Sequence, residues 1–346
     1  MKSVFVTGAG GYIGCVLVPE LLKRGYRVFA LDRFFFGKEK LPKDENLTLI
    51  QEDARCYPKE ILKDIDFVID LVAISNDPSG EKFEKQTWQI NHLSRVRTAT
   101  LAKQMGVKRY ILASSCSIYG FQEQIVDENS QTNPLTTYAR ANELAEKDIL
   151  KLADSGFCAL ALRQATLFGF SNRMRFDLAI NAMTYGAYKS SKLPLMRDGT
   201  QFRPFLHVKD AARAMIHMLE FENKTLINAQ IFNVGKDNYQ LKDVANLVAS
   251  EVKNITGKDV LIEFYGDPDR RSYRVSFEKI KKLTGFEPLI DISEGIREII
   301  QKLSSNELEK TPQTITLEWY TQLEMWHKLI KDLEIRGGML DINGCI

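Results

Sequence analysis

The sequence predicts an α/β fold in which a doubly wound parallel sheet carries a smaller mixed α/β lobe. Two observations lead to this class. Short, continuous apolar runs alternate with helical patterns up to about residue 165, as they do when buried parallel strands alternate with crossover helices. In addition, a glycine-rich turn joins the first apolar run to the first helical pattern. Because such crossovers are right-handed, few topologies remain for the sheet.

The predicted elements follow in a regular order. The strands are SVFVTG (3–8), YRVFALD (26–32), LTLIQED (47–53), DFVIDLV (66–72), RYILASS (109–115) and FCALALRQATLFG (157–169). The helices are YIGCVLVPELLKRG (12–25), a long stretch from 86 to 106, and the segment that starts at Tyr138. After Gly169 the pattern loosens, with a strand and a helix in FRPFLHVKDAARAMIHML and then short mixed elements.

These patterns divide the chain into three parts. We expect residues 1–169 to form the nucleotide-binding domain, 170–310 a discontinuous substrate-binding lobe that exchanges elements with it, and 311–346 a helical tail. Apolar residues three and four apart form one stripe on the tail helix, which two glycines end: Trp319, Leu323, Trp326, Ile330 and Leu333, then Gly337 and Gly338. The stripe either packs on its own subunit or forms a subunit contact.

Composition excludes several classes of function. The chain has 346 residues, 44% of them hydrophobic and 27% charged, and a formal net charge of +2, so nothing indicates a nucleic-acid or membrane-surface partner. No stretch approaches the ~20 apolar residues that span a bilayer, and the N-terminus does not resemble a signal peptide. The five cysteines of the chain form no CxxC pair, and its four histidines lack the spacing of metal ligands. We therefore expect a cytoplasmic protein without a bound metal.

The glycine-rich turn predicts a dinucleotide site. In VFVTGAGGYIG, Gly8, Gly11 and Gly14 follow a strand and open a helix. Such glycines permit the tight turn, the approach of the backbone to a pyrophosphate and close packing of helix on strand. Asp32 ends the second strand, where a carboxylate bonds the ribose hydroxyls of NAD and repels the 2′-phosphate of NADP. The sequence therefore predicts a Rossmann-type domain that binds NAD, an inference that the neighbouring Arg33 weakens.

Further residues are expected around the same cofactor. Asp53 follows the third strand, where its carboxylate is placed to bond the adenine amino group. The others border the cofactor from the glycine-rich turn and from the ends of the third and fourth strands: Tyr12, Ile13, Ala54, Leu71 and Ala73.

With these motifs, the chain resembles the extended short-chain dehydrogenase/reductase family, in its nucleotide-sugar epimerase and dehydratase branch. The resemblance covers about residues 1–300 and rests on TGAGGYIG, LASSCSIYG, PLTTYARAN, LRQATLFG, FRPFLHVKDAARA and DRRSYRVSFEKIKKLTGFEP. These motifs are specific for the family but not for the reaction. The resemblance implies a nucleoside diphosphate sugar as the substrate and a homodimer built through helices within 84–104 and 138–153.

The resemblance also implies roles for single residues. Ser115 corresponds to the residue that bonds the reacting sugar hydroxyl, and Tyr138 to the general base or acid at the same oxygen. Arg203 and Arg271 correspond to arginines that hold the diphosphate, a task that suits a guanidinium fork. The resemblance makes Asn91 largely structural. The remaining residues expected near the substrate are Ser75, Thr166, Arg173, Arg175 and Asn181.

Three positions depart from the family pattern. Asn142 stands four residues after Tyr138, where relatives carry lysine. Its amide can reach the nicotinamide ribose and join the cofactor contacts, but it supplies no charge to favour a tyrosinate. Cys116 and Ser117 stand where many 4,6-dehydratases carry Asp and Glu, which disfavours dehydration. Cys116 is either an acid–base group or a small buried residue.

Taken with the resemblance, the sequence predicts an NAD-dependent enzyme that transfers hydride at a sugar ring carbon, with C4 as the expected position. An epimerase that retains its NAD is the preferred reading. A C4 dehydrogenase or ketoreductase that exchanges NAD(H) with solution is the alternative enzyme. A non-catalytic protein that binds NAD and a nucleotide sugar is the alternative outside enzymes, because the usual lysine is Asn142.

Overall fold

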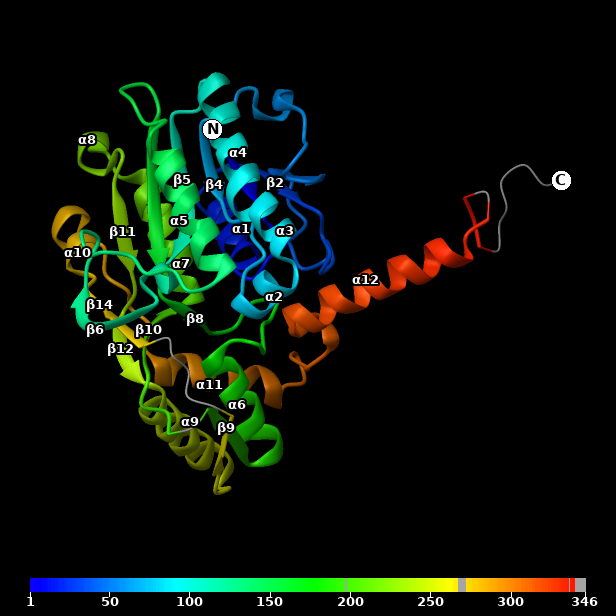
Figure 1. Ribbon diagram of the computed structural model, residues 1–346, viewed down its shortest axis with the longest axis vertical. Helices are drawn as coiled ribbons and strands as arrows, with labels where there is room; N and C mark the ends of the chain where they lie inside the picture. The colour runs from blue at the N-terminus through cyan, green and yellow to red at the C-terminus, as the bar shows by residue number, and fades with distance from the viewer. Residues whose placement is uncertain (197, 267–271, 336, 340–346) are drawn as a thin grey trace.

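The computed structural model describes residues 1–196, 198–266, 272–335 and 337–339. In Figure 1 the upper part is built on one large sheet, the lower part is a lobe of helices and short strands, and helix α12 projects to one side. The predicted α/β class is confirmed, because the large sheet consists of parallel neighbours that alternate with helices along the chain.

The large sheet has seven strands in the order β11-β7-β5-β4-β1-β2-β3. They are β1 (Ser3–Thr7), β2 (Arg27–Asp32), β3 (Leu47–Gln51), β4 (Phe67–Asp70), β5 (Arg109–Ser115), β7 (Cys158–Gln164) and β11 (Ile231–Val234). All of its neighbouring strands run parallel. The winding reverses between β1 and β4, which places a ligand crevice at the carboxyl ends of these two strands.

Helices pack around this sheet. They are α1 (Gly14–Lys23), α2 (Asp77–Lys82), α3 (Glu84–Thr87), α4 (Arg95–Gln104), α5 (Thr137–Leu150), α7 (Val208–Glu220), α8 (Lys224–Ile227) and α10 (Glu278–Thr284), with the 3₁₀ turns η1 (Lys59–Leu62) and η3 (Cys116–Tyr119). Because helices cover both faces, the strands are near-continuous apolar runs, and β1 is buried at every position.

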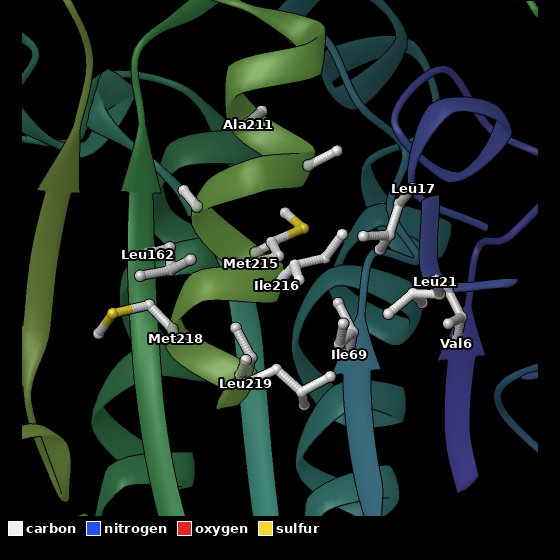
Figure 2. Close-up of a cluster of buried hydrophobic side chains, with 14 of the residues drawn as sticks. Val6, Leu17, Leu21, Ile69, Leu162, Ala211, Met215, Ile216, Met218 and Leu219 are labelled. Carbon is white, nitrogen blue, oxygen red and sulfur yellow. The ribbon is translucent and has the colours of Figure 1, made fainter. Parts of the chain in front are cut away.

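Each face of the sheet buries its own apolar cluster. On one face α7 and α1 pack on the strands, and Figure 2 shows Met215 and Leu219 of α7 turned toward the strands that carry Ile69 and Leu162. On the other face α4 and α5 bury small side chains such as Ala102 against the sheet.

The lower lobe consists of three small sheets and the helices beside them. The sheets β12-β10-β8, β13-β9 and β14-β6 are formed by β6 (Phe121–Val126), β8 (Thr166–Phe168), β9 (Lys192–Met196), β10 (Phe202–His207), β12 (Asp237–Gln240), β13 (Leu261–Tyr265) and β14 (Ser272–Val275). Helices α6 (Ala179–Ser190), α9 (Leu241–Thr256) and α11 (Ile292–Ser304) share a buried cluster that includes Ile180, Val248 and Ile296. Because α7 and β11 return to the large sheet, the chain passes between the two parts more than once.

The long helix predicted from 86 to 106 consists of three consecutive pieces. A π-helix, η2 (Trp88–Ser94), lies between α3 and α4. Its Asn91 is fully buried and exchanges two hydrogen bonds with the backbone of Ile74, at 2.8 and 3.0 Å. Asn91 therefore ties this helix to the loop after β4, which agrees with the structural role expected for it.

The tail forms η4 (Pro312–Thr314) and α12 (Thr316–Leu333). The helix ends before the predicted Gly337, because Glu334 adopts an extended conformation. Beyond Leu323 the predicted stripe is not covered by the described chain, and Leu333 is 57% exposed. Of the two readings left open, packing on the same subunit therefore applies to the first turns of α12.

The first turns of α12 dock on the loop after β2. Trp319 donates its indole N–H to the carbonyl of Phe35 at 2.7 Å. The ring of Tyr320 lies between those of Phe36 and Phe83, with centroid separations of 5.8 and 6.3 Å. Among the described residues, no helix has the length and apolar character needed to cross a membrane.

Candidate active site

One cavity of about 1010 Å³ lies between the glycine-rich turn, the carboxyl ends of the central strands and the lower lobe. It brings together most of the residues predicted for the site: Gly8, Gly11, Tyr12, Ile13, Gly14, Asp32, Arg33, Asp53, Ala54, Leu71, Ala73, Ser75, Ser115, Tyr138, Thr166, Arg175 and Arg203. Asn142 is not among the residues that line it. Arg271 lies outside the described residues.

The glycine-rich turn leaves no room for side chains at two positions. Gly8 has a φ of +68°, and a Cβ there would lie 2.8 Å from the backbone nitrogen of Val72. Gly14 begins α1, and a Cβ there would lie 2.2 Å from the carbonyl oxygen of Ala9. The tight turn and the close packing of helix on strand both require glycine for these reasons. The N-terminus of α1 therefore lies at the cavity, where it favours an anion.

Asp32 ends β2 at the cavity. Its carboxylate accepts the backbone N–H of Phe34 at 2.6 Å and that of Gly10 at 3.1 Å. Burial raises the pKa of Asp32, and these two N–H donors oppose that effect. Since a carboxylate has about four lone-pair positions, two remain for ribose hydroxyls.

Asp53 is held by two arginines. Arg55 donates to its Oδ2 at 2.7 Å and Arg33 donates to the same oxygen at 3.1 Å. The hydrogen bond from Arg55 holds the pKa of Asp53 well below its usual range. The Arg33 guanidinium is therefore partly paired with Asp53. This pairing makes Arg33 less able to attract the 2′-phosphate of NADP, so it weakens the argument against NAD. The adenine contact of Asp53 stays a prediction.

Arg173 places a poorly compensated cation on the cavity wall. Its side chain is 4% exposed and donates from Nη2 to Thr316 Oγ1 at 3.0 Å, but its Nε and Nη1 have no hydrogen-bond partner among the described residues. Its guanidinium also stacks 3.7 Å from the ring centroid of Phe36. Burial and the nearby Arg175 lower the pKa of Arg173 to about 10. A buried cation with free donors favours an anionic ligand.

The reaction centre predicted by resemblance is assembled at the ends of β5 and α5. Ser115 is the last residue of β5, and Tyr138 stands in the first turn of α5, which Thr136 caps by accepting the N–H of Ala139. Burial raises the pKa of the Tyr138 phenol, whereas Arg95 and a hydrogen bond with Ser115 lower it. The serine and the tyrosine both line the cavity.

Asn142 does not extend toward the cavity. Its side chain is 1% exposed, its Nδ2 donates to the carbonyl of Tyr138 at 2.9 Å, and its Oδ1 accepts from Nη1 of Arg95 at 2.7 Å. Both ends of the amide are therefore occupied inside the protein. The expected contact of Asn142 with the nicotinamide ribose has no support in this geometry, because a neighbouring buried arginine attracts the amide oxygen.

Arg175 lines the cavity, and its charge is paired with that of Asp177. It donates to both oxygens of Asp177, at 3.0 and 2.9 Å, and approaches the Ser75 hydroxyl at 3.3 Å. Burial opposes ionisation of Asp177, but the charge of Arg175 lowers its pKa to about 2. Arg175 is therefore fixed in position and available for hydrogen bonds, with little net charge to offer.

Two other predicted substrate residues differ in their surroundings. Arg203 lines the cavity from β10, and its guanidinium lies 5.4 Å from the ring centroid of Tyr273. Asn181 is fully buried: it accepts the N–H of Gly169 at 3.0 Å and donates to the Tyr12 hydroxyl at 3.2 Å. Asn181 therefore joins the glycine-rich turn to the lower lobe and does not line the cavity.

The residues after Ser115 offer no acid–base pair to the cavity. Cys116 is fully buried, and its thiol lies 3.2 Å from the carbonyl of Arg163. Burial raises the pKa of Cys116, so of its two readings the small buried residue fits. Ser117 does line the cavity, and its Oγ and the Oε1 of Gln164 have no hydrogen-bond partner among the described residues. Sequence reasoning gave neither of these two a substrate contact, because nothing in the local pattern marks an unpaired polar atom.

Comparisons with known proteins agree with this geometry. The sequence model of the NAD dependent epimerase/dehydratase family matches residues 4–235. UDP-glucuronic acid decarboxylase 1 of Danio rerio is 25% identical over 319 residues, which cover 89% of this chain and 74% of the relative. UDP-glucuronate 4-epimerase of Thermodesulfobacterium geofontis is 26% identical over 325 residues, covering 88% of this chain and 97% of the relative.

A solved structure shares the fold of most of the chain. MoeE5 in complex with UDP-glucuronic acid and NAD superposes with a TM-score of 0.78 and 26% sequence identity, over 89% of this chain and 100% of that one.

Proposed function

The chain belongs to the NAD-dependent epimerase/dehydratase family, and from that premise we propose that it inverts the C4 centre of a nucleoside diphosphate sugar while it retains its NAD. One observation carries the proposal: Tyr138 and Ser115 line the same cavity as the glycine-rich turn and Asp32. Uridine diphosphate is the expected nucleotide, because the similar proteins act on or bind UDP-sugars.

The cavity residues fit a bound NAD. The turn at Gly8 admits no side chain beside the phosphates, and the Asp32 carboxylate keeps lone pairs for the adenosine ribose. Arg173 lines the cavity, and the negative charge of the pyrophosphate would compensate its guanidinium. Bound NAD supplies the hydride acceptor and donor of the reaction.

The protein residues supply orientation and proton transfer. Ser115 holds the C4 hydroxyl by a hydrogen bond, and Tyr138 takes the proton of that hydroxyl as the C4 hydride departs. When hydride returns to the opposite face, Tyr138 gives the proton back to the same oxygen. No net oxidation follows, so no second substrate is needed. Dehydration is disfavoured, because Cys116 is buried away from the cavity and Ser117 is no acid.

Two cavity walls favour retention of the dinucleotide. Tyr320 and Leu323 of α12 line the cavity together with the glycine-rich turn. Arg173 also lines it and donates to Thr316 at the start of α12. A cofactor enclosed in this way exchanges slowly, which suits an epimerase more than a dehydrogenase that must release NADH in each cycle.

The test is a product analysis without added cofactor. Purified protein is denatured and its released nucleotide identified by chromatography; native protein is then incubated with UDP-glucose, UDP-glucuronic acid or UDP-N-acetylglucosamine, and products are read by proton NMR. We expect retained NAD and a mixture of C4 epimers. A requirement for added NAD would instead support the dehydrogenase, loss of carbon dioxide from the glucuronate a decarboxylase, and binding without turnover the non-catalytic alternative.

We further propose a homodimer through the helices within 84–104 and 138–153. Leu93 on η2 and Leu144 on α5 are 58% and 38% exposed, and η2 and α5 pack side by side. Ile149 is fully buried within its own subunit, so it does not belong to this surface. In sedimentation equilibrium, Leu144→Glu should give monomers, whereas Leu226→Glu, at a residue 42% exposed on α8, should not. A wild-type monomer at every concentration would contradict the dimer.

We place the protein in the cytoplasm as part of the same proposal. Cys15, Cys56, Cys116 and Cys158 are all unpaired in the described part of the chain, as is usual in a reducing compartment. Cell fractionation with a tagged full-length chain tests this, and recovery outside the cytoplasmic fraction would contradict it.

A further inference from the structure

A buried guanidinium lines the same cavity as Tyr138. Arg95 is 1% exposed, although it is among the residues that line the cavity. Its Nε donates to the carbonyl of Val72 at 2.8 Å and its Nη2 to that of Ala113 at 3.0 Å. Val72 follows β4 and Ala113 lies in β5. The carbonyls at these strand ends therefore hold the guanidinium in one orientation.

Asn142 links this cation to the tyrosine. Its Oδ1 accepts from Nη1 of Arg95 at 2.7 Å, while its Nδ2 donates to the carbonyl of Tyr138 at 2.9 Å. An amide can serve both partners at once because it carries an acceptor and a donor. A lysine at this position could not accept from Arg95 and would place a second cation against it.

We propose that Arg95 supplies the positive charge that favours the ionised form of Tyr138, and that Asn142 positions Arg95 for this task. The inference rests on the proposed function, since it assumes that Tyr138 exchanges a proton with the substrate. Arg95 is a positioning residue in this scheme: it acts on the phenol and takes no part in bond making.

Of the charged groups near Tyr138, Arg95 is the cation that most favours ionisation of the phenol. From α2, Asp77 opposes ionisation of the phenol, whereas Ser115 at the end of β5 favours it. Arg175, from the segment after β8, also favours ionisation but is paired with both oxygens of Asp177. Among these, Arg95 does most to lower the pKa of Tyr138 against the effect of burial.

The acid nearest to Arg95 does not cancel this charge at the phenol. Asp70 lies 3.8 Å from Nε, whereas Nη1, the nitrogen bonded by Asn142, is at the other end of the fork. The carboxylate of Asp70 also accepts hydrogen bonds from Thr7 Oγ1 at 2.6 Å and from the Tyr110 hydroxyl. Several hydrogen-bond donors inside the sheet therefore stabilise the negative charge of Asp70.

The test moves the positive charge from residue 95 to residue 142. The pH dependence of epimerisation is measured for the wild type, Arg95→Gln, Arg95→Lys, Asn142→Lys and the double variant Arg95→Gln/Asn142→Lys. We expect Arg95→Gln to move the rising limb of the rate to higher pH by about one unit or more, and Arg95→Lys to move it less. The double variant should bring the limb back, because the introduced lysine then carries the charge without repulsion from an arginine.

A second readout needs no substrate. Ultraviolet difference titration of the phenol, with Tyr138→Phe as the blank, should show Tyr138 ionising at higher pH in Arg95→Gln and near its wild-type position in the double variant. This result stands even if no nucleotide sugar is turned over, so it separates failure of this inference from failure of the proposed function.

Two outcomes would overturn the proposal. One is an Arg95→Gln enzyme that loses rate equally at all pH values while its Tyr138 titration stays in place, which would mean a purely structural role. The other is a double variant that stays shifted. If Arg95→Gln does not fold, the isosteric Asn142→Asp replaces it: a carboxylate facing Arg95 should raise the titration of Tyr138, and an unchanged titration would equally refute the coupling.

Discussion

The dinucleotide end of the cavity and the Tyr138 end are built in different ways. At the dinucleotide end, the backbone itself makes the site: Gly8 and Gly14 exclude side chains, and Asp32 ends a strand. At the Tyr138 end, the acidity of a single phenol must be adjusted. The positive charge that we assign to this task comes from Arg95, which lies on another helix. Local spacing therefore identifies a backbone-made site, whereas a charge can reach the same point from any element that is long enough.

The largest effect expected separates chemistry from binding. Tyr138→Phe removes the proton carrier, so turnover should fall by about 10²–10⁴-fold, the usual contribution of a positioned acid–base group. Retained NAD should change little, because the glycine-rich turn and Asp32, which we expect to hold the pyrophosphate and the adenosine ribose, are unaltered. Turnover and nucleotide content are measured on the same preparation. Hydride transfer at the wild-type rate in this variant would remove Tyr138 from the mechanism.

The next effect concerns the dinucleotide end alone. Asp32→Ala removes the acceptor for the ribose hydroxyls, a charge-assisted contact worth about 1.5–3 kcal/mol, so NAD should bind ten-fold or more weakly. NADP binding should improve relative to NAD, since repulsion is relieved. Calorimetric titration of the apo-protein with both nucleotides checks this, and the pH limb of the remaining activity should stay in place. Wild-type protein that prefers NADP would contradict the assignment.

Arg173 gives a prediction with opposite signs for binding and stability. Arg173→Met should weaken NAD by about ten-fold, because the cavity wall loses a positive charge that favours the pyrophosphate. The ligand-free protein should unfold at the same temperature or higher, since a poorly compensated buried cation is removed. Arg297→Met, at an exposed guanidinium paired with Glu251, is the matched control and should change neither quantity. A destabilised apo-protein with normal NAD affinity would make Arg173 purely structural.

The smallest effect belongs to the substrate side. Arg203→Ala should raise KM by about ten-fold with little change in kcat, because a phosphate contact is made in the ground state and the transition state alike. Initial rates over a range of UDP-sugar concentrations test this. Arg274→Ala, at a half-buried residue of β14 that is not among those lining the cavity, serves as the control. An unchanged KM in Arg203→Ala would remove this arginine from the substrate contacts.

Sequence reasoning located the dinucleotide end well for a physical reason. Gly8, Gly14 and Asp32 follow from the geometry of one strand, one turn and one helix, so their spacing is visible in a short stretch. The central strands of the large sheet were located for the same reason, because burial on both faces demands continuous apolar runs. The edge strand β11 was instead assigned to the substrate lobe, because it follows in the loosely patterned part of the chain.

The Tyr138 end could not be predicted in full. The contact of Arg95 with Asn142 joins α4 to α5, and no local pattern announces it. Sequence reasoning expected Asn142 to extend to the cofactor because it considered the amide without the arginine that holds it. The π-helix η2 was missed as well, since a single extra residue hardly disturbs the apolar periodicity of the stretch.

The wide turn η2 makes the chain sensitive to a change of length at that point. A π-helical turn holds one residue more than an α-helical turn, and each residue rotates an α-helix by about 100°. Loss of one codon between Trp88 and Ser94 would let the segment relax into a regular helix and would turn either Asn91 or Arg95 away from its partners. Natural relatives that keep both residues should therefore keep the length of this segment, while the exposed loop at 43–45 is free to grow or shrink.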